Sequence, residues 1–407
     1  MQPESMVTIP PGEYPQRRAR AAALATELGC DGMLVVGRSA GSYDNMANVF
    51  WLTHHAFVAP IVVPTGPWKA YGHDFVVIDG DGRSALATVG RAEPAFIDDM
   101  RLGIDVEQLA VDAIRDLGLT SGTLALVGSE VLPWTVAKRL EREFPGLSFR
   151  PADLEMAQLR ATLSEAECAM LRQATAVGSS ILTAALEAVK VGATDGDVAA
   201  AGWGVAARTP HTQHWNFIMA SGEHAGDYAP GAFPAWDPAT PYRRGDLIHP
   251  DCYGYVDGYM YDVQRTMVVG QQPSADQMFL LRGTWEMADL LGATLRDGIT
   301  CREIYLAGVG FMRDYGYRKD EPAESWMEGG HFGHGYASGF DWPWLGVTAP
   351  GADTPLTAPF AVTIELAWSS KEVGAVWVEE NWLVTKDGPE NLTASVPRTL
   401  VADAPAR

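Results

Sequence analysis

The chain has 407 residues, of which 47% are hydrophobic and 20% are charged, a composition typical of a globular protein with a core of normal size. At roughly 150 residues per domain, this length is enough for two or three domains. Acidic residues outnumber basic ones by 51 to 30, and the net charge of −21 argues against nucleic acid or an anionic membrane surface as a partner, because both require a basic surface.

The first half of the chain alternates predicted helices and strands. Residues 15–29 have helical spacing and end at Gly29, a typical C-terminal stop. Two more helices are predicted at 92–118 and 131–146, and short apolar strands at 31–37, 48–53, 60–64, 74–82, 85–90 and 124–128. This alternation predicts an α/β domain over residues 1–155, and without a GxGxxG or Walker loop nucleotide binding is unsupported.

The second half, residues 156–407, is predicted to be a separate α+β domain. A long helix begins near residue 162 with Thr162 or Ser164 as its N-cap, and a second helix covers 195–209. A strand at 216–222 and a hairpin at 249–270 follow, and then helices at 275–297 and 301–315 and a final strand-rich stretch.

Cysteine usage and hydropathy both favour the cytoplasm. No CxxC pair or zinc-ribbon spacing occurs among the four cysteines, Cys30, Cys168, Cys252 and Cys301. The first 20 residues lack the apolar run of a signal peptide, and no stretch of 18 or more apolar residues is present. We therefore expect a cytoplasmic protein that does not bind membranes.

The hairpin at 249–270 carries two aspartates, Asp251 and Asp262, one on each side of the turn Asp257-Gly258. Eleven residues apart on one straight strand they would face opposite sides, but folding back makes them near neighbours. Two adjacent carboxylates repel each other unless a positive charge lies between them.

A second pair of acids has the same arrangement. Glu365 and Glu379 are 14 residues apart and centred on SSKEVG, another predicted hairpin turn. Glu380 follows Glu379 directly and should point to the opposite face, so the choice between these two depends on a strand register that the sequence does not give.

His334 lies between the two pairs in the sequence, flanked by Gly333 and Gly335, which allow the backbone to approach another group closely. Four carboxylates and one imidazole on neighbouring strands would have to hold protons or collect cations, and two divalent ions would balance the charge. Oxygen ligands with one imidazole suit Mn, Fe, Co or Zn, and a two-metal site can polarise a carbonyl and activate water.

These motifs, in this order, resemble the "pita-bread" metalloenzymes that include aminopeptidase P, prolidase and creatinase. Residues 251–266 resemble the family's Asp-x10-Asp hairpin with its Arg-Thr ending, and residues 332–339 resemble its Gly-His-Gly motif. Residues 362–368 and 378–385 resemble its two glutamate strands, and 161–174 its entry helix. The resemblance is strong over about 155–390 and loose over the first 150 residues.

The resemblance implies a creatinase-like N-terminal domain, a pita-bread catalytic domain, a homodimer and two divalent metal ions. The implied metal ligands are Asp251, Asp262, His334, Glu365 and Glu379. The implied activity is hydrolysis of a C–N bond in a small amide, dipeptide or creatine-like compound, with Glu365 relaying the proton.

Two departures from the family bear on the substrate. Peptidase members carry a histidine after the Ser-Gly at 221–222, where His224 comes too early, and another seven residues beyond the metal-binding histidine, where this chain has Asp341. Its first glutamate strand also reads Glu-Leu-Ala in place of Glu-Pro-Gly. A relative that cleaves dimethylsulfoniopropionate is a lyase with an aspartate base near this point, so metal-dependent elimination with Asp341 as the base is the alternative.

Other polar and aromatic residues are candidates for the site. His331 could reach the pocket as a catalytic or supporting group, His224 and Asp227 could contact substrate, and Trp342 and Trp344 flank Asp341 and could wall the pocket. Cys252 should face the core, and Arg265 and Thr266 should brace the hairpin. A third class, a non-catalytic binding protein, is opposed by the complete set of five ligands.

Overall fold

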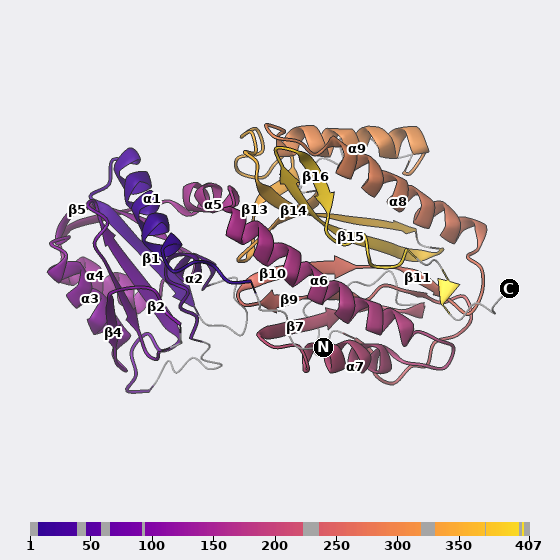
Figure 1. Cartoon of the computed structure of the whole chain (residues 1–407), viewed down its shortest axis with the longest axis horizontal. Helices are drawn as coiled ribbons and strands as arrows, with labels where there is room; N and C mark the ends of the chain where they lie inside the picture. The colour runs from indigo at the N-terminus through magenta and orange to yellow at the C-terminus, as the bar shows by residue number, and fades with distance from the viewer. Residues whose placement is uncertain are drawn as a thin grey trace. The chain divides into compact units, whose positions relative to one another are not determined.

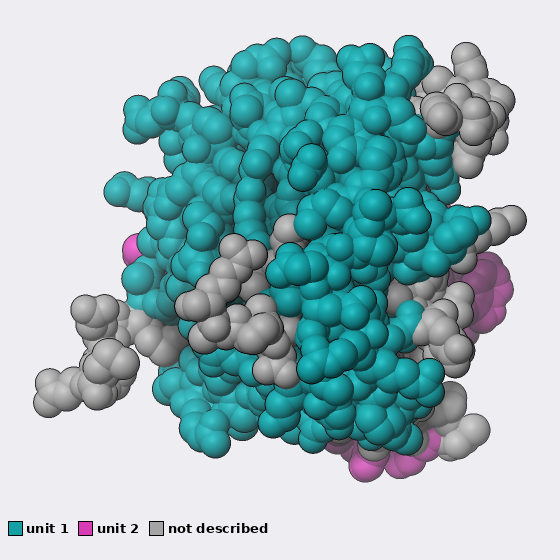
Figure 2. Space-filling view, turned by 90° about the vertical axis from the view of Figure 1, so that its right-hand side faces the viewer, with its two compact units in different colours: residues 1–7, 161–407 teal, residues 8–160 magenta. Residues whose placement is uncertain are grey.

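The computed structural model describes residues 7–38, 46–57, 66–91, 94–222, 236–318, 330–370, 372–398 and 401–402. The chain divides into two compact units (Figure 2), one comprising Thr8–Arg160 and the other Ala161–Arg407 with Met1–Val7. The division therefore falls five residues after the boundary expected from the sequence, near the C-terminal end of helix α5, Asp153–Ala161.

The smaller unit is built on a six-stranded mixed sheet with the strand order β4-β3-β2-β1-β5-β6. These strands are β1 Gly32–Arg38, β2 His73–Asp79, β3 Ser84–Thr88, β4 Asp99–Leu102, β5 Ser121–Val127 and β6 Gly146–Pro151. Its other helices are α1 Glu13–Glu27, α2 Ala47–Thr53, α3 Val106–Asp116 and α4 Trp134–Glu143. Alternate residues of β1 enter two separate apolar clusters, so both faces of the sheet are buried under helices.

The α/β class predicted for this half is confirmed, but two of its elements were predicted wrongly. Residues 48–53 form part of helix α2, not a strand, because a short apolar run does not by itself distinguish a buried helix from a strand. Residues 92–118 are not one helix, since β4 occupies 99–102 and α3 begins only after its N-cap Asp105. The strand predicted at 60–64 lies outside the described residues.

The larger unit contains an eight-stranded, largely antiparallel sheet (Figure 1) with the order β13-β12-β14-β15-β10-β9-β7, in which β16 pairs with β15. Its strands are β7 Thr212–Ile218, β9 Asp251–Val256, β10 Tyr259–Gln264, β12 His331–Tyr336, β13 Phe340–Gly346, β14 Phe360–Ser370, β15 Gly374–Thr385 and β16 Gly388–Asn391. A small sheet of β8 Leu247–Ile248, β11 Met267–Val269 and β17 Val401–Ala402 completes the strands described.

Four helices pack on the large sheet: α6 Glu165–Glu187, α7 Asp195–Ala206, α8 Ala275–Thr294 and α9 Cys301–Tyr315. Helix α6 lies along β9 and β10, and α8 lies along β14 and β15 (Figure 1). Ser164 is the N-cap of α6 and, with Glu167, forms a capping box, which settles the choice between Thr162 and Ser164. The predicted α+β class of this half is confirmed.

Helix glycines let aromatic rings of the sheet come close. A Cβ on Gly178 of α6 would lie 2.5 Å from the ring of Tyr261, and one on Gly283 of α8 would lie 2.2 Å from the ring of Trp368. Trp382 has the same relation to α8. These rings project from the helix-covered face of the sheet, which leaves the opposite face for polar side chains. None of the described helices is long and apolar enough to cross a membrane.

Candidate metal centre

The β9–β10 hairpin forms as predicted. Asp257 and Gly258 both have positive φ, 47° and 79°, as the two central residues of a tight hairpin turn require. In this register Asp262 pairs with Tyr253 and Asp251 pairs with Gln264, so the two aspartates are diagonal neighbours. Both therefore point to one face of the sheet, and Cys252 points to the other, where it is fully buried.

The β14–β15 hairpin places Glu365 directly opposite Glu379. Gln264 of β10 pairs with Glu379, and this single pair joins the two hairpins side by side. Glu365, Glu379, Gln264 and Asp251 thus form one row across four adjacent strands, all on one face. Glu380 points to the opposite face, where its carboxylate accepts hydrogen bonds from Arg398 and Asn391.

His334 reaches the same face from β12, where it pairs with Thr363 of β14. A Cβ on Gly333 would lie 2.0 Å from the Thr363 carbonyl oxygen, and one on Gly335 would lie 2.5 Å from that of Trp342. The two glycines therefore allow the close approach to neighbouring strands that their position around His334 suggested.

The His334 imidazole faces three carboxylates. Its Nε2 atom lies 3.7 Å from Asp262 Oδ2 and 3.9 Å from both Glu365 Oε2 and Glu379 Oε1. His334 is fully buried, and Nε2 has no hydrogen-bond partner among the residues that the structure describes. Its Nδ1 atom lies 3.0 Å from the Gly335 carbonyl oxygen, which favours the tautomer with the proton on Nδ1.

Burial and mutual repulsion perturb the pKa values of this cluster. Burial, together with the Asp251 carboxylate, raises the pKa of Glu365 to about 7. The pKa of Glu379 is raised well above its usual range, by burial first and then by the three carboxylates around it. Burial lowers the pKa of His334 to about 3, so its ring is neutral. Without a cation Glu365 and Glu379 therefore bind protons near neutral pH, and a bound cation would release them.

This donor set fits divalent metal ions. The ligand atoms of Asp262, His334 and Glu379 all lie within 4.8 Å of one another. Separations of 3.7–3.9 Å are too long for hydrogen bonds to Nε2. Two ligand atoms can bind the same ion when they are at most about 4.0–4.4 Å apart, so these atoms are close enough to do so. A neutral imidazole among clustered carboxylates is a combination that Mn, Fe, Co and Zn accept.

Two aromatic residues lie beside the cluster. The Trp344 ring is 5.6 Å from the ring of His334 and 5.2 Å from that of His331, and Phe340 is 3.7 Å from His334. Trp344 is therefore placed to contact a ligand at His334. His331 is exposed, and its Nδ1 accepts a hydrogen bond from the Gly333 amide. Trp342 is buried on the same strand as Trp344.

Asp341 pairs with Gly335, one residue beyond His334, and adjoins Phe340. Asp341 lies directly beside the register shift between the His334–Trp344 and Gly335–Asp341 pairs. Its Oδ1 accepts a hydrogen bond of 2.7 Å from the Trp342 amide. This register gives no support to Asp341 as a base at the metals, and its role stays a prediction. His224 and Asp227 lie outside the described residues.

Sequence reasoning missed Gln264 and Asn381. Gln264 is fully buried in the row of acids, and its Oε1 has no hydrogen-bond partner among the described residues. The signal available was its position two residues after Asp262, which puts both side chains on one face. Arg265 was assigned correctly as a brace, since it donates to the carbonyl oxygens of Gln264 and Glu379.

Comparison with known proteins identifies the family. Residues 169–386 match the model of metallopeptidase family M24, and residues 17–162 match that of the creatinase/prolidase N-terminal domain. The chain belongs to metallopeptidase family M24. As a member of this family it is a metal-dependent hydrolase, and the pita-bread fold predicted from its motifs is confirmed.

Individual relatives agree with the M24 assignment. The chain is 25% identical over 293 residues to a Xaa-Pro dipeptidase of Pyrococcus horikoshii, covering 70% of this chain and 74% of the relative. It is 23% identical over 331 residues to a Xaa-Pro dipeptidase of Pyrococcus furiosus, covering 79% and 87%. Among solved structures, an X-Pro aminopeptidase of Thermotoga maritima matches with a TM-score of 0.75 at 20% identity, covering 95% of this chain and 99% of the other.

Proposed function

We propose that this M24 protein is a dinuclear-metal hydrolase that cleaves the C–N bond of a small amide or dipeptide. The names of the two Pyrococcus relatives, both Xaa-Pro dipeptidases, support a dipeptide as the substrate class. The proposed metal ligands are Asp251, Asp262, His334, Glu365 and Glu379. Four carboxylates with one neutral imidazole supply enough negative charge for two divalent cations.

The observation that carries the proposal is the position of His334 Nε2. A fully buried acceptor nitrogen lies 3.7–3.9 Å from oxygens of three carboxylates contributed by β10, β14 and β15. An unsatisfied buried polar atom costs roughly 1–3 kcal/mol, and at His334 the unsatisfied nitrogen faces acids that could share a cation with it. A shared cation removes that cost for the imidazole and the acids together.

The metal ions, when bound, would supply Lewis acidity toward the substrate carbonyl and the attacking water. The chain would add proton transfer through Glu365, whose side chain is 19% exposed, compared with 6% for Asp262 and 2% for Glu379. Glu365 is therefore the one of these three carboxylates that can reach a substrate nitrogen. Water then adds across the C–N bond, its oxygen to the carbonyl carbon and its protons to the departing amine and the resulting acid.

Trp344 would bind the apolar part of the substrate beside His334, because an indole at this place presents a flat apolar wall. Asp341 replaces the histidine found seven residues beyond the metal-binding histidine in peptidase members. Ordinary Xaa-Pro peptides are therefore not the only amides to test, and other small amides, including creatine-like compounds, belong in the same assay.

The experiment is metal analysis of protein purified without a chelator or a histidine tag, followed by a substrate screen in water enriched in oxygen-18. About two transition-metal ions per chain and a label in the acid product would support the proposal. An unsaturated product without label would identify a lyase and would return Asp341 to the mechanism. Absence of metal after exposure to Mn, Fe, Co and Zn would refute both. We also expect the protein to be cytoplasmic and to form a homodimer, and sedimentation of the purified protein tests the homodimer.

A further inference from the structure

The two hairpins that carry the acids meet along a seam between β10 and β15. Asp251 and Asp262 lie on the β9–β10 side of this seam, and Glu365 and Glu379 lie on the β14–β15 side. The distance between the two acid pairs is therefore set by what holds β10 to β15. Across this seam the described residues give one main-chain pair, Gln264 with Glu379.

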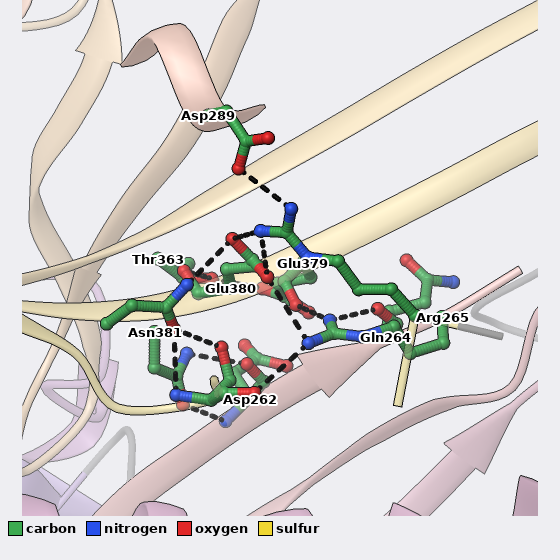
Figure 3. Close-up of polar contacts among 11 residues, drawn as sticks. Asp262, Gln264, Arg265, Asp289, Thr363, Glu379, Glu380 and Asn381 are labelled. Atoms are coloured by element: carbon green, nitrogen blue, oxygen red, sulfur yellow. Dashed lines mark hydrogen bonds and ion pairs between the residues drawn. The ribbon is translucent and has the colours of Figure 1, made fainter. Parts of the chain in front are cut away.

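Side chains replace main-chain pairing on both sides of that pair, and Figure 3 shows the side formed by Asn381 and Asp262. The Asn381 amide donates from Nδ2 to the Asp262 carbonyl oxygen at 2.6 Å and accepts from the Asp262 amide at 3.3 Å. The Thr266 hydroxyl contacts both the amide and the carbonyl oxygen of Trp377, at 2.8 and 2.7 Å. Asn381 of β15 thus bonds to both backbone polar groups of Asp262 on β10, and Thr266, two residues after β10, bonds to both backbone polar groups of Trp377 on β15.

A side-chain amide between two strands holds them farther apart than a direct ladder, in which strands lie about 4.8 Å apart. Asn381 supplies this spacer at the level of Asp262, the aspartate whose carboxylate faces His334 Nε2. The spacing of Asp262 from Glu379 therefore depends on the length of one side chain.

The chemistry of this spacer is specific. Asn381 is fully buried, and its Oδ1 also accepts a hydrogen bond from Thr175 of α6 at 3.4 Å. An amide in this orientation offers a donor to the Asp262 carbonyl and an acceptor to the Asp262 amide at the same time. A side chain without these groups would leave the polar backbone of Asp262 without its partners inside the protein.

The other ligand of this seam is held separately. Thr363 donates its hydroxyl proton to Glu379 Oε1 at 2.9 Å, and Arg265 donates to the Glu379 carbonyl oxygen at 2.7 Å (Figure 3). Glu379 therefore has its own supports, whereas the backbone of Asp262 is tied to β15 by Asn381.

We propose that Asn381 is a positioning residue that sets the separation of Asp262 from Glu379 and thereby the geometry of the metal centre. This inference rests on the proposed function, because it takes these two carboxylates as metal ligands. Asn381 itself does not bind metal, since its amide is occupied by the backbone of Asp262 and by Thr175.

The test compares the metal affinity of Asn381→Leu and Asn381→Ala with that of the unaltered protein. Leucine keeps nearly the size of asparagine and removes its hydrogen bonds, while alanine removes the spacer as well. Dissociation constants for Co²⁺ come from calorimetry, and the absorption bands of bound Co²⁺ report the ligand geometry. We expect an affinity loss of about 10–100-fold in both variants and shifted bands, as loss of a residue that orients ligands typically produces.

Val376→Ala is the matched control. Val376 is fully buried in the same strand but points to the helix-covered face, so its truncation lowers the melting temperature without touching the seam. It should retain the Co²⁺ affinity and spectrum of the unaltered protein.

The outcomes separate the two proposals. Unaltered protein that binds no Co²⁺ refutes the metal centre itself and this inference with it. Unaltered protein that binds Co²⁺, with both Asn381 variants binding it equally well and with the same spectrum, overturns the positioning role alone. A loss of affinity in Val376→Ala as large as that in Asn381→Leu also overturns it, because general destabilisation would then explain the effect.

Discussion

Glu380→Gln tests which of two adjacent glutamates serves the metal centre and which serves the fold. Glu380 is fully buried on the helix-covered face, where its carboxylate lies 3.3 Å from Arg265 and 2.9 Å from Arg398. Both guanidinium groups also lie over the ring of Trp285, at 5.0 and 4.3 Å from its centroid. Glutamine keeps the shape of the side chain and removes the charge that faces both cations, of which Arg398 also pairs with Asp289 at 2.8 Å.

The expected loss follows from the burial of Arg265, which is 2% exposed. Burial lowers the pKa of Arg265 to about 10 even with Glu380 beside it, so the guanidinium remains charged at pH 7. Removing one partner of a buried ion pair typically costs about 3–5 kcal/mol, because the remaining charge stays buried without compensation. At about 2–4 °C per kcal/mol for a unit of this size, the melting temperature should fall by about 6–20 °C.

Thermal unfolding followed by circular dichroism, with and without metal, measures this loss. Glu390→Gln is the matched control, because Glu390 pairs with Arg172 at 2.7 Å but both side chains are about half exposed. Such surface pairs contribute about 0–1 kcal/mol. Glu380→Gln should still bind two metal ions at saturation, whereas Glu379→Gln should not. A Glu380→Gln variant as stable as Glu390→Gln, or one that loses metal while Glu379→Gln retains it, would refute this reasoning.

Three further predictions concern the ligands, Asp341 and the smaller unit. His334→Ala and Asp251→Ala should each lower bound metal, measured by elemental analysis, and abolish activity; full metal content in both would sink the ligand assignment. Asp341→Asn should leave the metal content intact. The turnover rate of this variant tests the role of Asp341, since full activity would remove the residue from the mechanism. Burial raises the pKa of the Asp74 carboxyl group in β2 to about 7. Between about pH 4 and pH 7 the folded state keeps the proton of this group whereas the unfolded chain has lost it, so the free energy of unfolding should fall as the pH rises through this range. Asp74→Asn should abolish that loss, about 2.6 kcal/mol in urea unfolding compared at pH 5 and pH 8, and equal pH dependence in both proteins would contradict it.

Predictions from the sequence were correct where the residues of one short segment determine its structure. Asp257-Gly258 predicted a hairpin because a two-residue turn requires positive φ, and the structure has it. Thr162 and Ser164 both predicted a helix start at this point, and the structure has Ser164 as the N-cap of α6. The strand predicted at residues 48–53 was wrong because a short apolar run is compatible with either a strand or a buried helix.

The ligand set was predictable as far as residue type and strand alternation allow. Alternation put Glu379 and Glu380 on opposite faces, but only the pairing of Glu379 with Gln264 and Glu365 shows which one faces the acids. Asp341 illustrates the same limit. Its closeness to His334 in sequence suggested a shared site. In the structure Asp341 pairs with Gly335 beside a register shift and accepts a hydrogen bond from the Trp342 amide, and its role stays a prediction.

By itself the sequence predicted the hairpins and a set of candidate ligands, because turns and strand alternation depend on residues near one another in the chain, but it left open the choice between Thr162 and Ser164 and between Glu379 and Glu380. The tertiary structure alone decided how β10 and β15 meet, with Asn381 bonded to the backbone of Asp262 across 119 residues of chain. It also decided that Arg265 and Arg398 converge on Glu380. No pattern within a segment encodes such contacts, because they arise only when separate hairpins are brought side by side in one sheet and share a single buried interior.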